Sequence, residues 1–439
     1  MTEVFNIKQD KPHIGEMIRA LREHRDVSQD YVAKAVFENR SKISQIECGN
    51  KDCEDDLLLG IKTVLDMEIL PLTEAERPEF IEALYKWYNI ISDRDWETAD
   101  KLRTQLSLIK LLPHDKESNL LFSLFDCRFL LVINELDEAK KILDELDAMS
   151  DELSDAQLYH YNYNQGTYNT RLRQNQTALD YYLKAFELTK RGFEKNTSLY
   201  YNIAVCYERL GNVALAITYL EAACELYPTT QNNVSEFSLY NCLGINYAHI
   251  GLLQKAKETL DKAHAIALSK SETASSDNKI RMLSQVFINY GYTYRMAKKW
   301  NMAIEYLDKA LDILDKKGDF YLEAFYQKIR IFIERGNTLS CINLLAEGVQ
   351  LSKGSEMYST GFEILQIMIN LNDDTARDLE TRILPYLLKN NFIYPALDCA
   401  MVLRDYLKSK GSGSKIRALE MSEIIFTIHN MMMEGGVIE

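Results

Sequence analysis

One spacing of small and large residues occurs four times between residues 156 and 315, and it constrains the fold more than any other feature. In each copy a Gly or Ala is followed twelve residues later by Ala, then after four more by a large residue, and after three more by Ala. The copies begin at Gly166, Ala204, Gly244 and Gly291. Antiparallel helices approach closely where a small side chain faces a large one. The spacing therefore predicts four stacked helical hairpins.

This pattern resembles the tetratricopeptide repeat, in which each hairpin buries its apolar face on the next. Successive copies are 38, 40 and 47 residues apart, against about 34 in that family, which predicts some longer helices or loops. Weaker copies flank the four at residues 83–106, 123–146 and 320–351. The resemblance implies an all-α fold whose main part is a right-handed superhelical solenoid.

Composition excludes several classes of protein. The chain has 18 Gly and 7 Pro among 439 residues, which favours long helices with short turns. Its eight cysteines are scattered without a CxxC pair or a His/Cys cluster, so we expect no metal, no cofactor and a reducing cytoplasm. We find no secretion signal, no membrane span, and no nucleophile motif or phosphate loop, so we expect neither a membrane protein nor an enzyme.

The N-terminal segment predicts a compact head of four helices, over residues 14–25, 29–36, 40–48 and 54–67. The pieces IGEMIRALR, VSQDYVAKA and SKISQIECGN resemble the phage-repressor (Cro/C1, XRE-like) helix-turn-helix family. Residues 8–51 hold nine Lys/Arg and seven Asp/Glu, whereas the whole chain has a net charge of −14. A mildly basic head on an acidic body suits a module that contacts DNA while the body stays off the duplex.

The helix-turn-helix resemblance implies a double-stranded operator DNA as partner and assigns roles to individual residues. Gln29 matches the phosphate anchor of the second helix, and the third helix matches the one that enters the major groove. Arg22 and Glu47 match a structural ion pair. The turn usually carries Gly where this chain has Phe37, so we expect the turn to be built differently. The DNA-contacting candidates are Gln29, Asn39, Arg40, Ser41, Lys42, Ser44 and Gln45.

The first helix of each predicted hairpin carries a second stripe opposite its core stripe, which in the repeat family lines the inside of the superhelix. Amides recur on this stripe although Asn is a poor mid-helix residue. Amide side chains can bind the backbone of an extended peptide, Arg can bind carboxylates, and Tyr can supply apolar contact. Alternatively, the Asn residues bond neighbouring helices and stiffen the array. The peptide-contacting candidates are Asn164, Asn202, Asn289, Gln327, Arg171, Arg209, Arg330, Tyr163, Tyr201 and Tyr292.

Together the two halves resemble the RRNPP group (Rgg, NprR, PlcR and PrgX types) of peptide-pheromone receptors, and by length the NprR type. The resemblance implies a cytoplasmic quorum-sensing regulator: a homodimer that binds operator DNA under control of a short signalling peptide. The alternative is a helix-turn-helix regulator whose repeats bind a protein, such as a phosphotransfer protein.

We assign residues 1–72 to the DNA-binding domain and 73–407 to the solenoid, which binds ligand and dimerises. Residues 408–439 form a linker and a last helix. Within this segment, residues 408–415 are expected to be a flexible break. The last helix either caps the solenoid, which we favour, or pairs with a second subunit.

Overall fold

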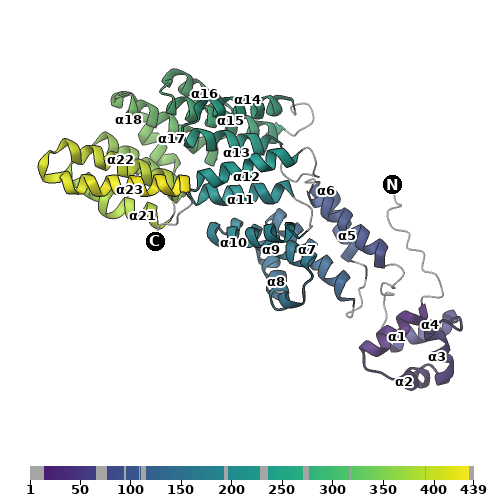
Figure 1. Ribbon diagram of the computed structural model, residues 1–439. Helices are drawn as coiled ribbons and strands as arrows, with labels where there is room; N and C mark the ends of the chain where they lie inside the picture. Colours follow the sequence, from purple (N-terminus) through teal and green to yellow (C-terminus); the bar gives the residue numbers. More distant parts are fainter. Residues whose placement is uncertain are drawn as a thin grey trace. The chain divides into compact units, whose positions relative to one another are not determined.

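The computed structural model describes residues 14–65, 77–92, 95–107, 109, 115–191, 196–227, 236–269, 276–316, 318–390 and 392–434. All regular structure in these ranges is helical, as the sequence predicts (Figure 1). The chain forms two compact units, residues 1–172 with 184–193, and residues 173–183 with 194–439. None of the described helices is long and apolar enough to cross a bilayer. The domain boundary predicted at residues 72 and 73 lies outside the described residues.

The head of the chain consists of α1 (Ile14–His24), α2 (Gln29–Ala35), α3 (Arg40–Glu47) and α4 (Asp55–Val64). Ser28 caps α2 by accepting from the Tyr31 amide, and Asn39 caps α3 by accepting from the Lys42 amide at 2.8 Å. Apolar side chains from all four helices meet in one core, which includes Ile18, Val32, Ile43 and Ile61. α2 and α3 begin where their capping residues predict, and α1, α2 and α3 end within one residue of the expected positions. The expected end of the fourth helix at residue 67 lies outside the described residues.

The turn between α2 and α3 is formed without glycine. Phe37 itself takes the left-handed conformation, with φ of +57°, and its side chain is 98% exposed. The expectation that this turn is built differently is therefore wrong. The backbone keeps the left-handed conformation that favours glycine, and Phe37 adopts it at a steric cost.

The first unit continues with two hairpins and one further helix. Trp87, in the first helix of the first hairpin, is buried. It donates from Nε1 to the carbonyl of Ala99, in the second helix of that hairpin, at 2.9 Å. Both hairpins lie where the weaker repeat copies are expected. The helices are α5 (Arg77–Ser92), α6 (Trp96–Ser107), α7 (Lys116–Ile133), α8 (Leu136–Asp147) and α9 (Asp155–Arg171). The next helix, α10 (Asn175–Thr189), is divided between the two units.

The second unit contains the hairpins whose spacing is most regular. A β-carbon added at Gly244 would lie 2.7 Å from the side chain of Leu260, and one added at Gly291 would lie 2.6 Å from Leu307. The predicted contact of a small with a large residue is confirmed at both positions. The helices are α11 (Thr197–Arg209), α12 (Val213–Leu226), α13 (Glu236–His249), α14 (Leu253–Ser269), α15 (Ser276–Met296), α16 (Trp300–Ile313), α17 (Asp319–Glu334) and α18 (Thr338–Leu351).

The C-terminal part folds back on this unit. Its last helix packs against α22 and also against α12, and it buries Ala418, Met421, Ile425 and Ile428. Residues 408–415, expected as a flexible break, form the end of α22, a 3-10 turn and the start of α23. The helices are α19 (Glu356–Ile369), α20 (Asp373–Asp378) with a π-helical turn over Leu379–Ile383, α21 (Leu384–Lys389), α22 (Ile393–Ser409) and α23 (Lys415–Glu434).

Candidate functional site

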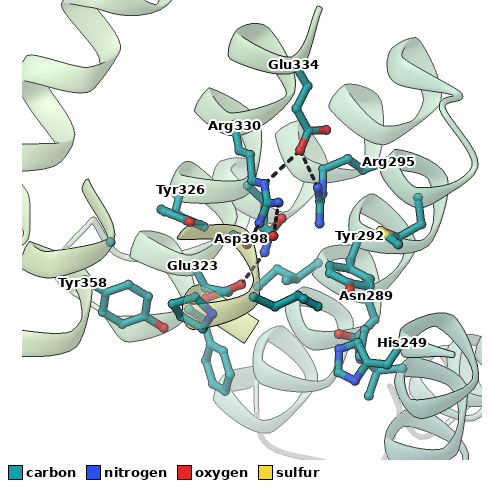
Figure 2. A pocket seen from close by; sticks show the side chains of 18 of the residues that line it. His249, Asn289, Tyr292, Arg295, Glu323, Tyr326, Arg330, Glu334, Tyr358 and Asp398 are labelled. Carbon is teal, nitrogen blue, oxygen red and sulfur yellow. Dashed lines mark hydrogen bonds and ion pairs between the residues drawn. The ribbon is translucent and has the colours of Figure 1, made fainter. Parts of the chain in front are cut away.

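The second unit contains a cavity of about 730 Å³. The first helices of three hairpins, α13, α15 and α17, supply most of the wall, and α11, α16, α19, α22 and α23 complete it. Figure 2 shows side chains that line the cavity. Its lining mixes apolar and aromatic side chains with convergent amides and charges, as ligand pockets do.

Four of the ten predicted peptide-contacting residues lie together in this cavity: Asn289, Tyr292, Gln327 and Arg330. Asn289 donates from Nδ2 to Asn241 Oδ1 at 2.9 Å, which joins α15 to α13. Gln327 donates from Nε2 to Glu323 Oε1 at 2.9 Å, one turn earlier on α17. The amides are thus held in fixed orientations at the cavity wall.

Two arginines and two carboxylates form a connected network along one side of the cavity (Figure 2). Arg330 pairs with Asp398 through both terminal nitrogens, at 2.5 Å for Nη2 to Oδ1, and donates from Nε to Glu334 at 2.9 Å. Arg295 donates from Nη1 to the same Glu334 oxygen at 2.7 Å. Burial opposes the charge of Arg330, but the adjacent Asp398 carboxylate outweighs it and raises the pKa of the guanidinium well above its usual value.

Two further ionisable groups in the lining are affected mainly by burial. Burial, with a smaller contribution from the positive charge of Arg295, lowers the pKa of His249 to about 3. The imidazole is therefore neutral at neutral pH and can both donate and accept. Burial also raises the pKa of the Glu208 carboxyl above its ordinary value.

Three predicted residues on α9 belong to the first unit and do not lie in this cavity. Asn164 is 2% exposed and donates from Nδ2 to the carbonyl of Leu124 at 2.7 Å, which ties α9 to α7. Tyr163 is buried beneath the guanidinium of Arg128, whose central carbon lies 4.6 Å from the ring centre. Arg171 is exposed at the end of α9. The expected ladder of amides is therefore wrong at Asn164, where the bond between neighbouring helices occurs instead.

Three predicted residues on α11 do not line the cavity either. Tyr201 and Asn202 are half-buried and Arg209 is exposed, while Glu208 is the α11 residue in the lining. Glu208 lies four residues after Ala204, as the lining residue Arg295 lies four residues after Gly291, so α11 contributes to this cavity only at that repeat position.

Sequence reasoning missed Arg295, Glu323, Glu334 and Asp398. On α17 a signal was available, because residues 323, 327, 330 and 334 are spaced four, three and four apart, which places them on one helix face. Asp398 lies beyond the region where the repeat pattern fades, so no repeat position marked it. No group of His, Cys, Asp and Glu in the described ranges has the arrangement of a metal site.

The head carries the predicted ion pair. Arg22 Nε lies 2.7 Å from Glu47 Oε1, and Gln29 donates from Nε2 to the other oxygen of Glu47 at 2.8 Å. These contacts link α1, α2 and α3 where the phosphate-anchoring glutamine is expected.

The predicted DNA-contacting residues on α3 differ in their availability. Arg40, Ser41 and Gln45 are exposed and Ser44 is half-buried. The side chain of Lys42 is 14% exposed, because its ammonium pairs with Glu38 at 2.6 Å. Asn39 uses its side-chain oxygen to cap α3.

Comparison with known proteins identifies relatives of this architecture. A tetratricopeptide repeat model matches residues 197–230, which include all of α11 and α12. The chain is 24% identical over 377 residues to the transcriptional activator NprA of Geobacillus stearothermophilus, covering 82% of this chain and 87% of that one. It is 21% identical to response regulator aspartate phosphatase E of Bacillus subtilis, covering 66% and 80%.

Solved structures also share this helical fold. The apo form of the quorum sensor NprR from B. thuringiensis superposes with a TM-score of 0.64 at 20% identity, covering 81% of this chain and all of that one. This chain has the fold of NprR. A structure of NprR in complex with its cognate peptide NprX superposes with a TM-score of 0.62 at 20% identity, covering 80% of this chain and 100% of that one. The resemblance to the RRNPP group is thus confirmed, and the NprR-like solenoid is where the cavity lies.

Proposed function

We propose that this protein is a cytoplasmic, peptide-responsive regulator of transcription, and that its ligand lies in the cavity of the second unit. The observation that carries the proposal is the arrangement of Asn289 and Gln327, amides from successive hairpins, in one cavity with a buried charge network. A volume of about 730 Å³ falls within the range of small-ligand pockets, about 300–1,000 Å³. The published complex of NprR with a peptide supports the same class of ligand.

The chemistry of the lining suits an extended peptide. Each amide side chain offers both a donor and an acceptor, which match the alternating N–H and C=O groups of a peptide backbone. Aromatic rings such as Tyr292 and Tyr326 provide apolar contact beside polar groups. An extended chain lying across α15 and α17 would meet both kinds of group.

The DNA-binding half of the proposal assigns base recognition to Arg40 and Gln45. Both are exposed on α3, and their side chains can form paired hydrogen bonds with guanine and adenine edges. We further propose a homodimer, because helix-turn-helix heads of this kind read half-sites about 34 Å apart.

Two measurements test these halves separately. Electrophoretic mobility shifts with operators selected from random DNA should show binding by the wild type and a loss of at least about tenfold in Arg40→Ala. Lys34→Ala is the matched control, since Lys34 is exposed on α2 and pairs with Asp30.

Calorimetry with peptides retained by the protein should show weaker binding in Gln327→Ala. Equal affinity of Gln327→Ala and the wild type would contradict the assignment of the cavity.

A second candidate is a protein partner for the repeats, since one relative is named a response regulator aspartate phosphatase. We propose that the chain itself is not an enzyme, because Glu334 and Asp398 of the charge network are engaged by Arg295 and Arg330 and are not free to act as bases. Incubation with a phosphorylated response regulator should leave its phosphoryl group intact, and faster hydrolysis would overturn this part of the proposal. A stoichiometric protein partner in place of a peptide would favour the second candidate.

A further inference from the structure

We propose that Arg295, rather than Arg330, binds a carboxylate of the ligand in the cavity. The inference rests on the proposed function and specifies which residue selects the ligand. It starts from the two arginines of the buried network, which are bonded to different extents.

Arg330 uses three of its five N–H groups in bonds to carboxylates of the protein. Both terminal nitrogens bond Asp398 and Nε bonds Glu334, so the guanidinium is engaged on both edges. A ligand carboxylate would have to compete with Asp398 for this guanidinium. Asp398 is held in place by α22, so its bond to Arg330 carries no entropic cost of binding, whereas a ligand's bond does. Arg330 therefore positions the network.

Arg295 is buried to the same extent but is less fully bonded. It is 6% exposed and lines the cavity, and its printed hydrogen bond runs from Nη1 to Glu334. Its Nε has no hydrogen-bond partner among the described residues. This Nε is shielded from solvent, and a buried donor left unsatisfied is costly, so a small turn of the guanidinium toward the cavity would let an acceptor of the ligand bind favourably at this edge. The guanidinium also lies 5.0 Å from the ring centre of Tyr292, which holds its plane in position.

A second unsatisfied atom lies on the neighbouring helix. Gln327 is 7% exposed and lines the same cavity, and its Oε1 has no hydrogen-bond partner within the described ranges. An acceptor there calls for an N–H from the ligand, as the donor at Arg295 calls for an oxygen. A peptide that carries a carboxylate has both groups close together.

The charge of the lining sets a further condition. Arg295 and Arg330 are balanced by Glu334 and Asp398, and Lys298 by Glu323, which leaves Glu208, whose pKa is raised by burial, as the remaining acidic group of the lining. A ligand that brings a carboxylate into this surrounding is favoured when it also brings an amino group. A peptide with free termini is such a zwitterion. The carboxylate itself is either the C-terminus or an Asp or Glu side chain, and the experiment separates these two sources.

The probe is a randomised heptapeptide library, synthesised once with free carboxyl termini and once amidated. Peptides retained by the full-length protein are quantified by affinity-selection mass spectrometry. The variants are Arg295→Met, which keeps the apolar stem, and Arg295→Lys, which keeps the charge beside Glu334 if the first fails to fold. Lys299→Met is the matched control, because it removes one exposed positive charge that does not belong to the cavity lining.

For the wild type we expect the free-acid library to be retained about 10- to 100-fold better than the amidated one, which corresponds to one charge-assisted hydrogen bond. Both Arg295 variants should reduce this ratio, Arg295→Met to near one, whereas Lys299→Met should preserve it. Equal retention of both libraries with enrichment of Asp or Glu, lost in Arg295→Met, assigns the carboxylate to a side chain and also supports the inference.

The ratio distinguishes selection from a structural role, because a merely structural arginine would weaken both libraries equally. The inference is overturned if the wild type retains peptides without preferring any carboxylate, or if Arg295→Met keeps the preference. Those results leave the proposed function standing. If the wild type retains no peptide from either library, the proposed function fails, and this inference fails with it.

Discussion

Phe37 occupies a backbone conformation that costs a phenylalanine about 1–2 kcal/mol, while its 98% exposed ring recovers little by packing. Glycine adopts this conformation without that cost. We predict that Phe37→Gly stabilises the head by about 1 kcal/mol, less than the full steric cost because glycine loses more entropy on folding. Hydrogen exchange of α2 and α3 amides should slow in this variant. Phe37→Ala keeps the strained conformation and should show little change, and equal protection of all three proteins would contradict the explanation.

His249 should affect stability as the pH falls. Its pKa is about 3 in the folded protein against 6.5 as its ordinary value, so the unfolded chain binds the proton more tightly. The stabilisation from the neutral imidazole is complete above pH 6.5 and is lost as the pH falls towards 3. We predict that His249→Gln unfolds with a smaller drop in stability between pH 7 and pH 5 than the wild type, measured by denaturant titration. An imidazole that titrates near 6.5 by NMR would contradict this prediction.

For individual residues, the sequence predicted a contact correctly where a known motif specifies both partners. Arg22 and Glu47 were predicted as a pair because the helix-turn-helix order places them together. Asn164 was misplaced because its position in the repeat is equivalent to that of Asn289, and sequence period alone does not reveal that the carbonyl of Leu124 lies within reach. Asn at this repeat position bonds the preceding hairpin in both cases, and only Asn289 also lines the cavity.

Among the helices, the contact between α15 and α16 leaves no room for added volume. A β-carbon at Gly291 would lie 2.6 Å from Leu307, so we predict that Gly291→Ala destabilises the second unit by about 1–3 kcal/mol. Gly413→Ala is the control, because no heavy atom lies within 4 Å of its added carbon. The clash should be relieved in part when Leu307→Ala is combined with Gly291→Ala, so the two changes should be non-additive in denaturant unfolding. Additive losses would show that the two residues do not press on each other.

The contact between α17 and α22 depends on a buried ion pair. Asp398→Asn leaves the Arg330 charge without its main partner, and we predict a loss of about 3–5 kcal/mol. Asp405→Asn is the control on the same helix, because Asp405 has a side chain that is 65% exposed and pairs with the adjacent Arg404. Differential scanning calorimetry should show a lower melting temperature for Asp398→Asn than for Asp405→Asn. Equal melting temperatures would mean that Arg330 finds another partner.

The helical hairpins were predictable because close packing requires small residues at fixed spacing, and this requirement is visible at Gly244 and Gly291. The return of α23 onto α12 was not predictable, because it joins distant segments through ordinary apolar residues such as Met421 and Ile425. No spacing rule connects such faces.

For the whole molecule, the proposal joins a DNA-binding head to a ligand cavity by linkage. If bound peptide favours a solenoid conformation with a different affinity for operator DNA, it changes the DNA affinity by some factor. Bound operator DNA must then change the peptide affinity by the same factor. The sequence predicted both halves, because each has its own motif. It placed the ligand less well, because the cavity is built partly by α19, α22 and α23, where the repeat pattern has faded.

The most direct test is a crystal structure of the full-length protein with a peptide selected from the free-acid library. We predict an extended peptide in the cavity of the second unit, with its backbone bonded to Asn289 and Gln327. A peptide bound on the outer helices α14, α16 or α18, with this cavity empty, would contradict the account.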